Sequence, residues 1–355
     1  MTEVSPPLTI SVIVPVHNGG ENFRQCLIAL QQALSPIDTI IVVADGVTDD
    51  SIKITDDLEI QVLRTPVRAG PAQARNQGAR SSQGDILFFV DADVLVYPHT
   101  IDLVRSVFTQ HPNLAAIFGS YDNAPYETNF LSQYKNLLHH KIHLTSNEDA
   151  STFWSGCGAI RREVFFNLDG YDENFDLPAI EDIELGYRLK KGGYKIRLEK
   201  ILQVKHLKYW DARTLLKTDF FQRALPWTQL ILRERLFIND LNLRISSRVS
   251  VILTYVLFCA LLTTPWQPSS LFLAGFCATL LLVINRSLYR FFMEKRGLWF
   301  TLRVIPWHWF YYFYSGLAFI LGTLRYFWGQ VQRSFGKRAL KSESSSKTVP
   351  QQNPE

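Results

Sequence analysis

A long run without charged side chains, from Val249 to Asn285, constrains the fold of this chain more than any other feature. A Pro-Trp-Gln-Pro motif at 265–268 interrupts the run. The two halves, of about 18 residues each, suffice for helices of roughly 27 Å, which match the hydrocarbon core of a bilayer. We therefore expect a transmembrane hairpin with spans at about 249–265 and 269–285.

A third charge-free run covers residues 304–324 and carries Trp and Tyr residues at one end, as is typical of a membrane interface. The segment between the second and third runs is basic, and the positive-inside rule predicts that it lies in the cytoplasm. Its basic residues are Arg286, Arg290, Lys295, Arg296 and Arg303. The segment after Leu324 is also basic, although three full crossings would place it outside. The third run is therefore either re-entrant or an exception to the rule.

Charge is distributed unevenly along the 355 residues, whose net charge is only +4. The chain has 24 Lys and Arg against 30 Asp and Glu up to Asp240, and 13 against 3 from Leu241 onward. The acidic front part argues against nucleic acid as a ligand, because phosphate binding needs a basic surface. The basic, apolar rear part suits an anionic membrane surface, so we expect the membrane as a partner.

Two further segments border the membrane region, which we assign to residues 248–328. Residues 211–247 mix apolar and basic side chains, which predicts amphipathic helices on the membrane surface. An ordinary packed helix pair under the front domain is the alternative. Residues 329–355 are basic and then polar, and we expect them to form a disordered tail.

The N-terminal residues and the cysteines indicate a cytoplasmic front domain. Residues 1–7 include an acidic residue and lack an apolar core, so no signal peptide is expected. The four cysteines contain no CxxC pair, which argues against a disulfide framework or a zinc site. We therefore expect a multi-pass protein of the cell (inner or plasma) membrane with its front domain in the cytoplasm.

Residues 1–210 show the alternation of strand and helix that is typical of an α/β domain. Apolar, β-branched runs indicate buried parallel strands, and helical spacing or capping residues mark the segments between them. The expected strands are 8–16, 39–44, 60–64, 86–90 and 194–198, and the expected helices are 20–34, 48–58, 71–81 and one from Glu181 to Leu189. This series predicts a doubly wound, mostly parallel sheet, whose ligands bind beyond the carboxyl ends of the strands.

Three carboxylates follow directly after predicted strands, namely Asp45 and the pair Asp91 and Asp93. A carboxylate buried at a strand end is costly unless it binds something. A Mn²⁺ or Mg²⁺ ion that bridges a diphosphate needs hard oxygen ligands of this kind. One Asp of the pair could bind the metal while the other reaches a ribose hydroxyl. Because an Asp-x-Asp motif is common by chance, a solvated loop cap is the alternative.

Several short motifs follow one another in order between Leu8 and His206. They are Ser11–Asn18 (SVIVPVHN), Asp45–Ser51 (DGVTDDS), Gly70–Ala79 (GPAQARNQGA), Asp91–Asp93 (DAD), Glu181–Asp182 (ED) and His206 itself. In this order and spacing they resemble the family 2 glycosyltransferases, which are inverting enzymes of the GT-A fold. The resemblance covers more than half of the chain. It implies a nucleotide-sugar donor, UDP- or GDP-linked, and a divalent metal, Mn²⁺ or Mg²⁺.

The resemblance also implies roles for nucleotide-binding residues. Pro15 and His17 lie on the segment that backs the nucleobase, and Asp45 would bind the base. The family usually has a further Asp one position earlier, where this chain has Ala44. Arg75 would lie near the nucleotide, with Asp91 reaching the ribose.

The resemblance assigns the metal to Asp93, with His206 as a possible second ligand. Glu181 and Asp182 match the acidic pair that supplies the catalytic base, for which we favour Asp182. Each assignment has a structural alternative. Asp45 could merely cap a turn, and Asp182 could merely cap a helix. Arg75 and His206 could be exposed surface residues.

The acceptor side is expected to include Trp154, Gly156 and Cys157, although apolar packing explains Trp154 equally well. A membrane hairpin suggests a lipid-linked or glycolipid acceptor, or it is a simple anchor. Processive synthases of the family carry a Gln-x-x-Arg-Trp motif, whereas Gln222–Trp227 here has the wrong spacing. We therefore expect transfer of one sugar.

Other classes fit less well. A nucleotidyltransferase or a dinucleotide oxidoreductase would need a Gly-rich loop after the first strand, and His17–Gly20 does not supply one. A transporter is disfavoured because the three apolar runs contain no Asp, Glu, Lys or Arg. A non-catalytic membrane scaffold with a degenerate transferase domain is the remaining alternative.

Overall fold

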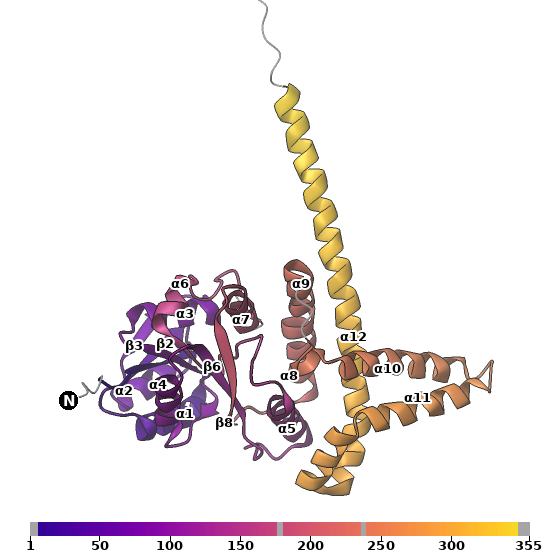
Figure 1. Cartoon of the computed structure of the whole chain (residues 1–355), viewed down its shortest axis with the longest axis horizontal. Coiled ribbons are helices and arrows are strands. Elements are labelled where there is room, and N and C mark those ends of the chain that lie inside the picture. The colour runs from indigo at the N-terminus through magenta and orange to yellow at the C-terminus, as the bar shows by residue number, and fades with distance from the viewer. Residues whose placement is uncertain (1–5, 176–179, 236–238, 347–355) are drawn as a thin grey trace, which may run out of the picture.

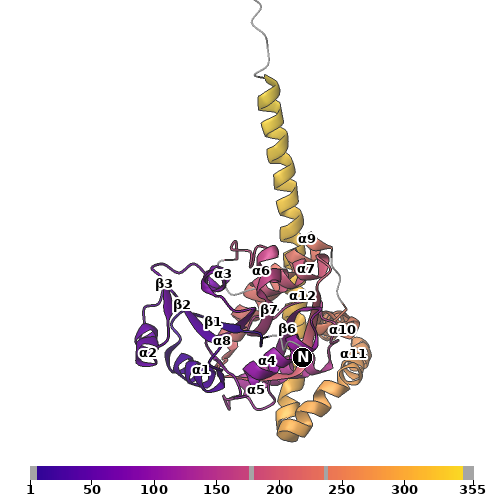
Figure 2. The same cartoon turned by 60° about the vertical axis from the view of Figure 1, so that its left-hand side comes forward.

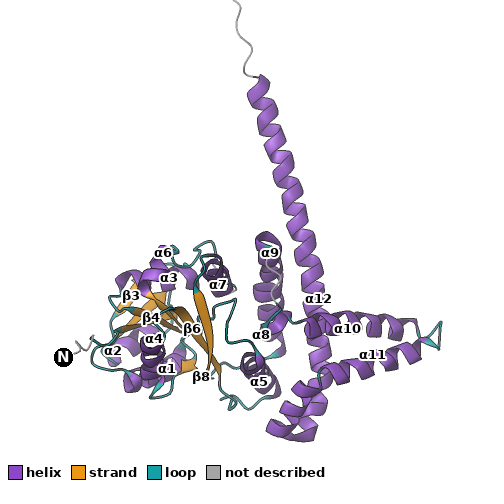
Figure 3. Ribbon diagram, in the orientation of Figure 1, coloured by secondary structure: helices purple, strands orange, loops and turns teal. Residues whose placement is uncertain are grey.

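The computed structural model of this chain describes residues 6–175, 180–235 and 239–346, with side chains up to Gln332. The front of the molecule is an α/β domain in which helices cover both faces of one sheet. The described part that follows the last strand is helical (Figure 1; Figure 3).

Eight strands form the sheet in the order β3-β2-β1-β4-β7-β6-β8-β5. They are β1 (Ile10–Val16), β2 (Thr39–Asp45), β3 (Val62–Thr65), β4 (Ile86–Val90), β5 (Val94–Leu95), β6 (Leu114–Tyr121), β7 (Cys157–Arg161) and β8 (Lys195–His206). Strands β1 to β4 are parallel to one another, as expected. Strand β7 runs antiparallel to both β4 and β6, which makes the sheet mixed.

Alternate residues of β1 point to opposite faces of the sheet and enter different cores. Val12 and Val14 pack with helices α1 and α4, whereas Ile13 packs with helices α3 and α7. The helices of the domain are α1 (Gly20–Ala33), α2 (Ser51–Asp57), α3 (Pro71–Ser81), α4 (Thr100–Gln110), α5 (Phe130–Thr145), α6 (Arg162–Asn167) and α7 (Glu181–Lys191). Two buried layers therefore hold the sheet and position its carboxyl-end loops.

The sequence patterns place most elements of the first 90 residues within three residues of their observed ends. Helix α3 and strand β4 have the expected bounds. Strand β8 is longer than the expected 194–198, since it continues to His206. The elements β5, α4, β6, α5, β7 and α6 were not anticipated.

Four short helical segments link the front domain to the rear: α8 (Ala212–Leu216), the π-helix η1 (Lys217–Ala224), α9 (Leu225–Glu234) and the 3₁₀ turn η2 (Leu241–Leu243). Leu215, Leu225 and Leu230 are buried, so the alternative of ordinary packed helices describes them better than a purely surface-bound arrangement. Phe221, in contrast, is 64% exposed.

The predicted hairpin is present as two helices, α10 (Ile245–Thr263) and α11 (Ser270–Ile284), which lie side by side (Figure 1). Among the described residues, α10 alone is long and apolar enough to cross a membrane by itself. Helix α11 could complete a span only together with the next helix, toward which it is bent by 65°.

The third apolar run lies inside a much longer helix, α12 (Arg286–Ser346), which is interrupted at Gly297, where φ is 82°. We expected a disordered tail from residue 329, but α12 continues to Ser346, and residues 347–355 lie outside the described part. Helical propensity in the basic segment 329–341 exceeds what its polarity alone suggested.

A buried polar cluster joins the front domain to the rear helices. The ammonium group of Lys135 on α5 lies 2.5 Å from Asp219 Oδ1 on η1. The hydroxyl of Tyr314 on α12 donates to Asp219 Oδ2 at 3.0 Å. Because an unpaired buried carboxylate is costly, this cluster fixes how η1 and α12 sit against α5.

Candidate active site at the carboxyl ends of the strands

Asp93 and His206 lie side by side because their strands pair. Strand β5 runs antiparallel to β8, with Val94 opposite His206, and the backbone amide of Leu207 donates to Asp93 O at 2.9 Å. As a result, Asp93 Oδ2 lies 3.6 Å from His206 Nε2. Two residues that are 113 positions apart are thus brought to one point.

The imidazole of His206 is buried and oriented by its neighbours. Its Nδ1 bonds to Asn136 Oδ1 at 2.7 Å, which fixes the orientation of the ring. Nε2 is thereby directed toward Asp93. Tyr121 stacks on the ring with centroids 4.2 Å apart. This support by a neighbouring oxygen is the arrangement that orients metal-ligating histidines.

The carboxylate of Asp93 is held in its charged form. Burial alone would raise its pKa, but the charge and hydrogen bond of His206, helped by Lys208, outweigh this and lower the pKa to about 2. In the described part of the chain, no three His, Cys, Asp or Glu side chains converge as metal ligands. One carboxylate and one imidazole fit a divalent metal whose remaining ligands are diphosphate oxygens and water.

Arg75 is buried and bridges two of the other predicted residues. Its guanidinium donates to Asp91 Oδ1 at 2.8 Å and to Glu181 Oε1 at 2.7 Å. The alternative of a solvated helix residue is therefore wrong for Arg75. Because Glu181 is committed to this pair, it is poorly placed to act as a free base.

Asp182 lies at the N-terminus of α7, where helix amides favour a carboxylate. Its Oδ2 accepts from the Ser155 amide at 3.1 Å, and its Oδ1 accepts from the Ile183 amide at 2.8 Å. Burial, together with the charge of Glu181, raises the pKa of Asp182 to about 6. A carboxylate with such a pKa suits proton transfer near neutral pH.

Asp45 accepts hydrogen bonds from the adjacent segment, residues 65–70. Its two oxygens accept from the amides of Ala69 at 2.6 Å and Gly70 at 2.9 Å, and Thr65 adds a hydroxyl at 3.1 Å. The carboxylate is only 4% exposed, so the turn-capping alternative describes its contacts in this structure.

His17 lies beside Asp45, and its Nδ1 bonds to the backbone oxygen of Asp45 at 2.7 Å. His17 is exposed, whereas Pro15 is half-buried within β1 opposite Val43. Of the predicted base-binding residues, His17 is therefore the most exposed.

Of the expected acceptor-side residues, Trp154 is half-buried, whereas Gly156 and Cys157 are buried. Trp154 packs on Tyr121 with ring centroids 4.9 Å apart. A Cβ at Gly156 would lie 2.5 Å from the Trp154 ring, so only glycine permits this indole position. Cys157 is fully buried in the hydrophobic core of β7, which corrects its expected place on the acceptor side.

Sequence reasoning missed the residues that line the site from α5 and β6. Tyr121 ends β6, and its ring stacks on His206 and packs at a tilt against His139. Asn136 and His139 lie on α5 and face the same point. Their three-residue spacing on one helix was the available signal, but nothing local shows which helix face meets the strand ends.

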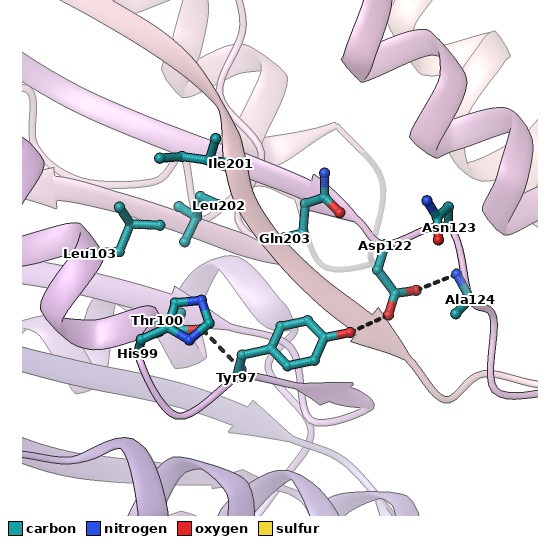
Figure 4. Close-up of a pocket in the computed structure, with 10 residues that line it drawn as sticks. All are labelled: Tyr97, His99, Thr100, Leu103, Asp122, Asn123, Ala124, Ile201, Leu202 and Gln203. Carbon is teal, nitrogen blue, oxygen red and sulfur yellow. Dashed lines mark hydrogen bonds between the residues drawn. The ribbon is translucent and has the colours of Figure 1, made fainter.

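A separate hollow of about 300 Å³ lies near β8, outside this site (Figure 4). It is lined by Tyr97, His99, Thr100, Leu103, Asp122, Asn123, Ala124, Ile201, Leu202 and Gln203. Asp122 already accepts from Tyr97 at 2.6 Å and from Lys205 at 2.7 Å, so its charge is satisfied by the protein itself.

Residues 11–168 match the family model described as Glycosyl transferase family 2. The pre-mycofactocin glycosyltransferase of Mycobacterium tuberculosis is 27% identical over 227 residues, which cover 61% of this chain and 45% of that protein. The O-antigen chain rhamnosyltransferase RfbN of Salmonella typhimurium is 23% identical over 239 residues, which cover 62% of this chain and 75% of that protein. The chain thus spans less than half the length of the mycobacterial relative.

A similar fold occurs in the mannosyltransferase PcManGT from Pyrobaculum calidifontis, whose structure is in complex with GDP-Man and Mn²⁺. The TM-score is 0.53 at 14% sequence identity, and the match covers 92% of this chain and 88% of that chain. At this identity the likeness concerns the fold alone. It extends over the helical rear part as well as the α/β domain.

Proposed function

We propose, from the family 2 glycosyltransferase domain that residues 11–168 of this chain form, that the protein transfers one sugar from a nucleotide sugar to an acceptor. The donor is a UDP- or GDP-sugar, and the acceptor is lipid-linked or a glycan. Transfer inverts the anomeric carbon and depends on Mn²⁺ or Mg²⁺. The front domain lies on the cytoplasmic face of the cell membrane, in which the apolar rear helices are anchored.

One observation supports this proposal above the others: Asp91, Asp93, His206 and Asp182 all surround the carboxyl end of β4 and the adjacent amino end of β7. Asp91 and Glu181 share Arg75, and Asp182 is bonded to Ser155. The next residue, Gly156, accepts from the amide of Asp91 at 3.3 Å. Clustered acidic groups are costly to desolvate, and a catalytically inactive domain would have no need to keep them together.

Asp93 and His206 would hold the metal, which when bound offsets the charge that grows on the leaving diphosphate. Asp91 lies next to them, is about one third exposed, and is oriented by Arg75, as a ribose-binding carboxylate would be. Exposed His17 would flank the base. Trp154 would lie under the acceptor.

Asp182 would remove the proton from an acceptor hydroxyl while the acceptor oxygen attacks the anomeric carbon. The bond from that carbon to the diphosphate oxygen breaks in the same step, with the electron pair leaving on the diphosphate. Because the pKa of Asp182 is about 6, it is mostly ionised at pH 7 and ready to accept a proton. An acceptor phosphate is already anionic, and Asp182 would then only orient it.

The deciding experiment measures release of nucleoside diphosphate from a panel of UDP- and GDP-sugars. The purified protein is reconstituted in lipid with Mn²⁺ or Mg²⁺, and Asp93→Ala is the control. We expect metal-dependent release from one donor, which also identifies the sugar. If no donor is turned over and no nucleotide binds in a metal-dependent way, the scaffold alternative replaces this proposal.

A further inference from the structure

Helix α12 is oriented differently from the hairpin that precedes it. The axes of α11 and α12 differ by 65°, and the hairpin α10–α11 projects sideways from α12 in both views of the molecule (Figure 1; Figure 2). If the hairpin enters a bilayer along the membrane normal, α12 must lie strongly inclined to that normal. A helix in this orientation runs along the membrane surface instead of crossing the membrane.

Many of the exposed apolar side chains of α12 share one face along its length and form a stripe, and Leu298, Phe319, Ile320, Leu321 and Phe327 are exposed in addition. The residues of the stripe recur at intervals of three, four, seven or eight residues, which keeps them on one face of an α-helix. The stripe consists of Trp299, Leu302, Phe310, Leu317, Leu324, Trp328 and Val331, each between 37% and 80% exposed. Exposure of such an apolar face to water is unfavourable, and among the described residues no other segment covers it.

The opposite face of α12 is used by the protein itself. Val304, His308 and Ala318 are buried there, and His308 Nδ1 bonds to the hydroxyl of Tyr134 on α5 at 2.8 Å. On the same side, Gly322 meets Thr228 of α9 so closely that a Cβ would lie 2.8 Å from the Thr228 side chain. Helix α12 is therefore two-faced, with the catalytic domain on one face and an apolar stripe on the other.

The hairpin packs against α12 next to the stripe. A Cβ at Gly316 would lie 2.5 Å from the Tyr255 ring and 2.7 Å from Val251, both on α10. The hydroxyl of Tyr255 also donates to Phe313 O at 2.9 Å. Because α10 contacts α12 beside the stripe, one bilayer can receive both the hairpin and the stripe.

A shallow hollow of about 700 Å³ between α9 and α12 belongs to the same surface. Its lining residues include Phe221, Leu225, Leu324, Arg325 and Trp328. Apolar walls beside a guanidinium match lipid tails beneath an anionic head group.

We propose that α12 is an interfacial helix, half-embedded along the cytoplasmic surface of the membrane, so that the chain enters the bilayer only through the hairpin α10–α11. Both ends of α12 then stay on the cytoplasmic side. This accounts for basic residues on each side of the third apolar run, Arg290 and Arg303 before it and Arg325 after it, without an exception to the positive-inside rule. The inference depends on the proposed membrane anchoring but not on the proposed catalysis.

Cysteine labelling tests on which side α12 ends. Gln332→Cys and Arg290→Cys are each labelled with a membrane-impermeant maleimide in intact and in opened cells. Cys26 and Cys157 are buried and Cys259 and Cys277 lie in the hairpin, so the unsubstituted chain supplies the background. We expect both positions to react only after the cells are opened. Reaction of Gln332→Cys in intact cells, with Arg290→Cys still protected, would show that α12 crosses and would overturn the inference.

The depth of α12 gives a second test that does not depend on sidedness. A spin label is placed at Leu302→Cys, Leu317→Cys or Leu324→Cys, and its depth is read in vesicles that contain anionic phospholipid. An interfacial helix gives similar, shallow depths at all three positions. A crossing helix makes Leu317→Cys the deepest by far. Labels that report no lipid contact at all would instead contradict the membrane anchoring, whatever the outcome of the donor assay.

Discussion

The front sheet and the rear hairpin are similarly apolar but bury their side chains in opposite ways. Leu87, Phe88 and Phe89 on β4 are fully buried, so protein atoms surround them. On α11, Phe272 is 85% exposed and Phe276 is 60% exposed, although these residues are equally hydrophobic. The difference teaches that internal packing stabilises the front, whereas the rear leaves apolar side chains exposed, which the proposed membrane anchoring would cover.

The sharpest test of this comparison pairs Phe89→Ala with Phe272→Ala. Removing the buried ring should cost about 3–5 kcal/mol of unfolding free energy, because a cavity remains. Removing the exposed ring should change it by about 0.5 kcal/mol or less in detergent. Thermal unfolding of the front domain in detergent measures both. Similar losses at the two sites would mean that α11 packs against protein after all.

Asp93→Ala should lower metal-dependent release of nucleoside diphosphate by about 100-fold or more, because a charge-stabilising group at the leaving diphosphate is lost. The matched control is Asp102→Ala, which removes a carboxylate that is 73% exposed on α4. The control should keep normal turnover. Normal turnover in Asp93→Ala itself would exclude the metal role.

Asn136→Ala should weaken the apparent affinity for Mn²⁺ by about 10–100-fold, since it removes the group that orients His206. The dependence of turnover on Mn²⁺ concentration measures this, with exposed Asn123→Ala as the control. Saturating Mn²⁺ should largely restore the rate. A loss that excess Mn²⁺ does not relieve would point to a folding defect.

The rate of transfer to a hydroxyl acceptor should rise with pH and level off above about 6, where Asp182 becomes ionised. Below that pH the rate should fall about tenfold per unit, as for a single essential base. Asp182→Asn should abolish this transfer. A flat profile between pH 5 and 8 would contradict the base assignment.

The raised pKa of Asp182 suits catalysis but lowers the stability of the folded protein at neutral and higher pH. Because folding raises the pKa of Asp182 above its ordinary value of 3.8, its charged form destabilises the fold, and this cost is present above pH 6 and absent below about pH 4. Asp182→Asn should therefore raise the melting temperature at pH 8 and leave it unchanged at pH 4. A lower melting temperature at pH 8 would show that the carboxylate is needed structurally.

Local patterns predicted those parts of the molecule whose cause is local. The bounds of α3 and β4 follow from a proline at the helix start and from a β-branched or aromatic run. Asp91 and Asp93 were found because they end such a run. The partners of these residues were not predictable: Arg75 meets Glu181, which lies 106 positions away, only because α3 and α7 cover the same face of the sheet.

By itself, the sequence determined the α/β series, the acidic strand ends, the charge-free hairpin and the likeness to family 2. These depend on side-chain periodicity and composition, which short segments carry within themselves. Tertiary structure alone decided that β5 pairs with β8 and places His206 beside Asp93, that the core encloses Cys157, and that α12 turns by 65° away from α11. Each of these depends on which distant surfaces pack together, and short segments do not carry that information within themselves.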